Sequence, residues 1–208
     1  MSERILIPGG GGGKGFDYFR EAGTTDYECW YPCGFLTHTT TTGGGTAPTA
    51  DRIYLFPFPS GRGGRVDRIG CELTSVGGAN SKVRLGIYQS LSDKRLKPDK
   101  LLLDSGEIAC NSGSVKTATV SVVLPANKLL WGALTATGGG GTMPSFRLVT
   151  SMTPTIFGFS SAFGASASPR GWTLVTQTYG ALPDPCPSAG TLQNTGANYY
   201  LIALRYDQ

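Results

Sequence analysis

The chain has 208 residues and a formal net charge of +4, and its 18 basic residues are scattered along it. So mild a charge, without a basic stripe or a recognisable module, argues against a nucleic-acid-binding protein. No apolar run of about 18 residues is present to span a membrane, and the N-terminus lacks the apolar segment of a signal peptide, so we expect assembly in a cytosol. Only 15% of the residues are charged and 31 are glycine, which is typical of an all-β protein that covers much of its surface with copies of itself or with a partner.

The first segment contains five consecutive glycines, which end at Gly13 and are followed by Lys14. A nucleotide-binding phosphate loop needs Gly, four residues, Gly-Lys and then Ser or Thr. Alignment on Gly13 and Lys14 puts Pro8 at the first glycine and Gly15 at the hydroxyl that holds magnesium. The run therefore predicts a pliable chain and no nucleotide site.

Residues 1–48 are predicted to form an extended N-terminal attachment arm that ends in a Thr/Gly linker. Disordered chains contain few aromatic residues, whereas this arm is rich in them. We expect its aromatic side chains to become ordered when they are buried against a partner. The predicted docking residues are Phe16, Tyr18, Phe19, Tyr27, Trp30, Tyr31 and Phe35.

Residues 49–208 are predicted to form one β-sandwich domain. Apolar side chains alternate along short segments, and Gly, Asn, Ser and Pro separate these segments. About eight or nine strands at this spacing predict an antiparallel β-sandwich of the jelly-roll type. The segments are 51–58, 66–76, 82–90, 100–110, 117–124, 129–137, 145–151, 171–179 and 198–208.

The residues needed for common hydrolytic chemistry are scarce. His38 is the only histidine and lies in the linker, which argues against most Ser-His-Asp and Cys-His hydrolases. Glycoside hydrolysis needs a pair of carboxylates, and no pair stands out, because each candidate is also explained as a strand-edge or turn residue. The candidates are Asp67, Glu72, Asp104, Glu107 and Asp184. We therefore expect a non-enzymatic protein without a cofactor.

The cysteines are odd in number and widely spaced, so they predict buried thiols and no disulfide framework. Cys29, Cys33 and His38 resemble part of a zinc site, but a structural site needs four ligands and no fourth lies nearby. We expect no metal there and favour packing of Trp30 and Tyr31 around the two thiols. A disulfide between Cys29 and Cys33 is the alternative in oxidising surroundings.

Two long loops near the C-terminus, 159–171 and 180–198, are candidates for binding because recognition often resides in loops on a rigid scaffold. Three aromatic residues lie near them and are possible glycan contacts: Trp172, Tyr179 and Tyr199. For Trp172 and Tyr199 we favour packing in the core or between subunits.

Residues 62–134 resemble a module that recurs in fibre and spike proteins of tailed bacteriophages and gene-transfer agents. The resemblance is carried by Asp67-Arg68-Ile69, Arg84-Leu85-Gly86-Ile87-Tyr88, Asp104-Ser105-Gly106-Glu107, Leu124-Pro125 and Leu130-Trp131-Gly132-Ala133-Leu134. The chain departs from it at Asn127-Lys128, where glycine is usual. The resemblance implies a structural or adhesive protein, often trimeric, which is attached by its N-terminus with its sandwich facing outward. It implies no catalytic residue.

The hypothesis that joins arm and sandwich is a non-enzymatic virion protein of a phage: a head fibre, a capsid decoration protein or a small tail-fibre subunit. Its partners would be phage capsid or tail proteins and copies of itself, as a homotrimer. It would lie on the virion surface after assembly in the host cytoplasm. The alternatives are an adhesin that binds a host surface glycan and a spike that cleaves one.

Overall fold

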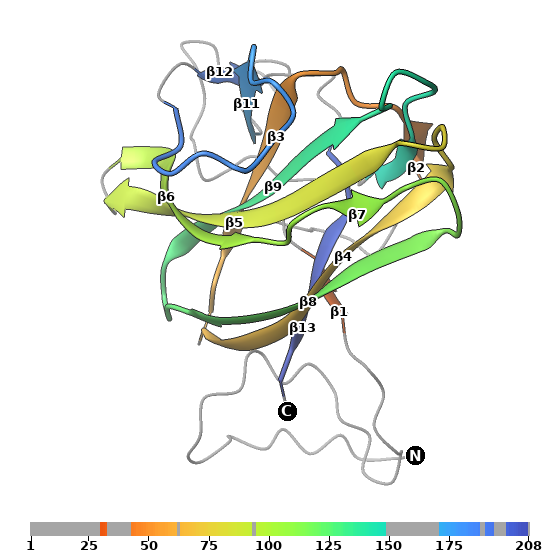
Figure 1. The fold of residues 1–208 in the computed structure, drawn as a ribbon. Coiled ribbons are helices and arrows are strands. Elements are labelled where there is room, and N and C mark those ends of the chain that lie inside the picture. The colour runs from red at the N-terminus through yellow and green to blue at the C-terminus, as the bar shows by residue number, and fades with distance from the viewer. Residues whose placement is uncertain are drawn as a thin grey trace, which may run out of the picture.

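The computed structural model describes residues 30–32, 43–61, 63–92, 95–148, 171–187, 190–193 and 199–207. These residues contain no helix and form two antiparallel sheets that pack face to face (Figure 1). The predicted all-β sandwich is confirmed.

The first sheet is built around the long strand β4. Strand β8 lies along one side of β4, and β13 and β10 follow one another along the other side. Strand β1 pairs with β13, and β2 pairs with β10. The strands are β1 (Trp30–Pro32), β2 (Gly43–Thr46), β4 (Gly64–Ser75), β8 (Val115–Leu124), β10 (Ser145–Leu148) and β13 (Ile202–Tyr206).

The second sheet has the order β12-β11-β3-β9-β5-β6, and the short strand β7 also pairs with β5. Its strands are β3 (Arg52–Pro59), β5 (Lys82–Ser92), β6 (Arg95–Asp104), β7 (Ile108–Ala109), β9 (Leu129–Thr137), β11 (Gly171–Val175) and β12 (Gly190–Gln193).

Eight of these strands are nested as pairs, the first with the last. Strand β2 pairs with β10, β3 with β9, β4 with β8 and β5 with β6, all antiparallel, and the pairs alternate between the two sheets. This nesting is the jelly-roll topology. Strands β1 and β2 come from residues that the sequence analysis assigned to the arm and the linker, so the sheet draws two of its strands from before residue 49.

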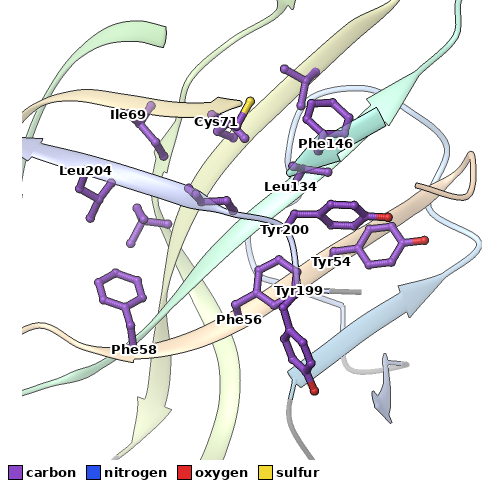
Figure 2. Close-up of a cluster of buried hydrophobic side chains, with 14 of the residues drawn as sticks. Tyr54, Phe56, Phe58, Ile69, Cys71, Leu134, Phe146, Tyr199, Tyr200 and Leu204 are labelled. Atoms are coloured by element: carbon purple, nitrogen blue, oxygen red, sulfur yellow. The ribbon is translucent and has the colours of Figure 1, made fainter. Parts of the chain in front are cut away.

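The core lies between the sheets and is rich in aromatic side chains (Figure 2). Tyr54 and Phe56 of β3 meet Tyr200, which precedes β13, and the rings of Tyr54 and Tyr200 are edge to face with centroids 4.9 Å apart. Phe146 of β10 packs on the same tyrosine with centroids 5.9 Å apart. Each such ring pair adds about 0.5–1.5 kcal/mol to the stabilisation from burial alone. The core therefore joins strands from the two ends of the chain.

Candidate functional site

Most of the predicted docking aromatics lie outside the described residues: Phe16, Tyr18, Phe19, Tyr27 and Phe35. The backbone of Trp30 and Tyr31 forms β1, with Trp30 opposite Arg205 and Tyr31 opposite Leu204. The beginning of β1 is therefore next to the end of β13. Cys29, Cys33 and His38 lie outside the described residues, and the part of the chain that the structure describes contains no cluster of three metal-binding side chains.

The three predicted glycan-contact residues do not form a common surface. Tyr199 is 5% exposed and packs in the core against Phe56, with ring centroids 5.8 Å apart. The backbone of Trp172 lies in β11 opposite Leu55 of β3. Tyr179 is half-buried in the segment after β11, and its amide donates a hydrogen bond to Asp51 Oδ1 at 3.1 Å. Burial, aided by the nearby charge of Glu107, raises the pKa of the Tyr179 hydroxyl to about 12.

A second apolar cluster lies on the outer face of the second sheet, which is the face away from the main core. Of the surfaces among the described residues, this one combines the most apolar and polar contacts. The cluster's members from the strands are Ile53, Leu55, Tyr88, Trp131 and Ala133, and the segment 176–187 adds Leu182 and Cys186. We call this segment the covering loop.

Hydrogen bonds fasten the covering loop to the sheet. The hydroxyl of the fully buried Tyr88 donates to the carbonyl oxygen of Pro183 at 2.8 Å, and burial raises the pKa of that hydroxyl. The amide of Leu182 donates to Asp104 Oδ2 at 3.0 Å. The sequence analysis treated 180–198 as a candidate binding loop, and the structure shows residues 182–186 packed on the sheet. The sequence of strand β9 could have indicated that the outer face is covered. Its residues Leu130–Ala136 form one continuous buried run, which is typical of a strand that is buried on both faces.

Asp104 is the polar centre of this site. Its carboxylate accepts hydrogen bonds from Arg84 Nη1 at 2.9 and 3.1 Å and from the amide of Gly106 at 2.9 Å, in addition to the amide of Leu182. Both charged side chains are mostly buried, with 17% of Arg84 and 19% of Asp104 exposed. Gly106 has a φ of +71°, which favours glycine and closes the turn after β6.

Two of the motifs that carry the resemblance thus meet in space. The first contains Arg84 and Leu85 on β5, and the second begins at Asp104. Besides the ion pair, the amide of Leu85 donates to Ser105 Oγ at 2.9 Å, and Lys82 forms an ion pair with Glu107. These residues build a turn and hold the covering loop.

The other carboxylates considered as catalytic candidates also accept hydrogen bonds from neighbouring residues. Asp67 receives two hydrogen bonds from Arg205, which hold the pKa of its carboxyl below the usual value. Glu72 is paired with Arg147 in the same way, and its pKa is also lowered. Asp184 accepts a hydrogen bond from the amide of Leu101 at 3.1 Å.

The described cysteines are buried thiols. Cys71, Cys110 and Cys186 are free and buried. Burial raises the pKa of the Cys110 thiol to about 11 and that of Cys186 to about 12, and it also raises the pKa of Cys71. Since the thiolate is the reactive form, these three side chains act as small apolar residues at neutral pH.

Comparison of the chain with protein-family models and with curated proteins found no match. Among the described residues, no helix has the length and apolar character that crossing a membrane requires.

Proposed function

We propose that this protein is a non-enzymatic structural component of a phage virion: a head fibre, a decoration protein or a small tail-fibre subunit. It docks on the particle by its N-terminal segment and displays the sandwich outward. The observation that supports this proposal is the contact between Arg84 and Asp104, because it joins two separate motifs of the phage-module resemblance. Residues that resemble the module along the chain also work together in the fold.

The direction of the strands supports a docking end and a displayed end. Strand β1 begins beside the end of β13, where Tyr206 is opposite Val66 near the start of β4. At the opposite end of β4, the turns 76–81, 110–114 and 138–144 are joined by backbone hydrogen bonds, including Gly77 N to Cys110 O and Gly78 N to Thr142 O, both 2.9 Å. We call these three turns the tip. A chain that docks by the residues before β1 presents the tip outward.

The energy for docking comes from aromatic burial and from copy number. Burying one large aromatic side chain contributes roughly 1.5–3 kcal/mol, so Phe16, Tyr18 and Phe19 together supply a sizeable part of a specific contact. Many copies on one particle make weak contacts of the outer surface effective through avidity.

Co-sedimentation with particles that lack this protein tests the proposal. The variant replaces Phe16, Tyr18 and Phe19 by Ser, and the matched control is Val76→Ser at the tip, where Val76 is 45% exposed. Substitutions are preferable to deletion of residues 1–48, because that deletion also removes β1 and β2. We expect the wild-type chain and the control to pellet with the particles, and the triple variant to stay in the supernatant.

Other outcomes favour other functions. Equal pelleting of the triple variant would mean that the sandwich itself contacts the particle and would remove the docking role from these aromatics. If no form of the protein pelleted but all bound whole host cells, the glycan-binding adhesin would become the better hypothesis. Release of reducing sugar from host polysaccharide would point to a glycan-cleaving spike.

A further inference from the structure

Each sheet ends in a long strand whose outer edge has no strand partner among the described residues: β6 in the second sheet and β8 in the first. The exposed edge of a sheet presents unpaired N–H and C=O groups to any other strand, and natural proteins usually protect it with charges, proline or a covering loop.

The edge at β6 has all of these protections. Its sequence includes Pro98, with charged residues on both sides of it. The covering loop also binds its backbone, since the amide of Cys186 donates to the carbonyl of Asp99 at 2.7 Å and Asp184 Oδ1 accepts from the amide of Leu101.

The edge at β8 has almost none of them. The strand reads VKTATVSVVL, with Lys116 as its only charged residue and no proline. Its inward side chains, Ala118, Val120 and Val122, pack against the core. On its outward face Val115 and Val123 are 68% and 72% exposed, which makes them two of the three exposed large apolar side chains among the described residues.

We propose that β8 pairs antiparallel with β8 of a second copy of this chain, across a two-fold axis at Thr119. In this register Val115 lies opposite Val123 of the second copy, Thr117 lies opposite Ser121, and Thr119 faces its own counterpart. Thr opposite Thr or Ser is among the cross-strand pairs that stabilise sheets, and contact between Val115 and Val123 removes exposed apolar surface from water. The first sheets of the two copies thereby become one continuous sheet.

The register follows from the sequence of the strand. Side chains alternate between the two faces, so an antiparallel partner must shift by whole two-residue steps to keep outward residues opposite outward residues. An axis at Ala118 would put Val115 opposite Ser121, and an axis at Val120 would put Val123 opposite Thr117. Only the axis at Thr119 brings the two exposed valines together, and it also keeps the two copies of Lys116 apart.

A second copy is the occupant that matches this strand, because the pattern is complementary to itself when reversed. A two-fold contact of this kind uses the same surface on both subunits. The inference is independent of the proposed function. It also differs from the trimer that the resemblance implies, because a three-fold axis joins two different surfaces.

The test measures the mass of the full-length chain in solution by sedimentation equilibrium over a dilution series. Val115→Lys with Val123→Lys places like charges opposite each other at both ends of the contact. Val115→Lys with Val123→Glu places opposite charges there in the same register. Val76→Lys is the control, because Val76 is the third exposed valine and lies outside β8. All three substituted positions, Val76, Val115 and Val123, carry solvent-exposed side chains in the isolated chain, so we expect the fold to tolerate the changes.

We expect the wild-type chain and Val76→Lys to have twice the 21.8 kDa mass of one chain. The Lys/Lys variant should raise the dimer dissociation constant by about 100-fold, and the Lys/Glu variant should recover most of that loss. A wild-type mass of one or of three chains would overturn the proposal, and a monomer would leave open that the residues before β1 occupy this edge. An unchanged dimer in the Lys/Lys variant, or a Lys/Glu variant no better than Lys/Lys, would also overturn it.

Discussion

The two sheets of this sandwich have similar topology, but they differ in how far other parts of the chain cover their outer faces and edges. The second sheet is buried on its inner face by the main core and on its outer face by the covering loop, and the same loop protects its edge at β6. The first sheet contributes to the same core, but its strand β8 exposes Val115 and Val123 outward. The difference teaches that the jelly roll itself leaves surfaces open and that added chain segments decide which of them remain available for contact.

The burial patterns of strands β9 and β8 reflect this difference. Residues Leu130–Ala136 of β9 are buried without interruption, because both faces of that strand are covered. Strand β8 alternates between exposed and less exposed residues from Ala118 to Val123, which is typical of a sheet that faces water on one side.

Removing the largest side chain under the covering loop should have the largest effect on the free energy of unfolding. Trp131 is fully buried in the second cluster, and its indole N–H donates to Ser90 Oγ at 3.0 Å. Trp131→Ala should lower the free energy of unfolding by about 3–5 kcal/mol, because it loses the transfer energy and leaves a cavity. Urea denaturation measures this change, and Val76→Ala, which removes exposed carbon only, should stay within about 0.5 kcal/mol of the wild type. A loss below about 1 kcal/mol for Trp131→Ala would contradict the sealed outer face.

Breaking the ion pair of Arg84 and Asp104 beneath the covering loop should lower the free energy of unfolding by a smaller amount. Asp104→Asn removes the negative charge that pairs with Arg84 and weakens the contact with the amide of Leu182. We expect a loss of about 2 kcal/mol in the free energy of unfolding, because Arg84 is left mostly buried without its counter-charge. Glu107→Gln at the neighbouring exposed pair is the matched control and should change the stability much less. Equal effects of the two substitutions would mean that burial does not distinguish the pairs.

The smallest expected effect on the free energy of unfolding comes from the pair of Asp67 and Arg205 in the first sheet, and it depends on pH. Arg205 lowers the pKa of Asp67 from its ordinary value of 3.8, so the pair stabilises the fold above that pH and loses its contribution as the pH falls through the lowered pKa. The urea midpoint of Asp67→Asn should therefore lie below that of the wild type near neutral pH, and the gap should narrow as the pH falls below about 3.8. A gap that stayed constant in strong acid would assign the effect to packing of the side chain and not to its charge.

Much of the fold could be predicted because it is encoded locally. Alternation of apolar and polar residues, with turn residues between the segments, predicts β4, β5, β8, β9 and β13 without any knowledge of their partners. Buried thiols follow from cysteines that lie within such strands, as at Cys71.

Other features were decided by tertiary structure alone, because they depend on hydrogen bonds between residues far apart in the chain. Strand β2, with the sequence GGGT, has no side-chain pattern of its own and is a strand because it pairs with β10. The covering loop contains Gly and Pro typical of an exposed loop, yet it is held by Tyr88 and Asp104, about 80–100 residues earlier in the chain. Sequence alone determined where most of the long strands lie and which of their faces are buried against the core. The partners that cover the outer faces and the edges were decided only when the sheets assembled, because backbone amides and carbonyls carry no sequence signal of where they will pair.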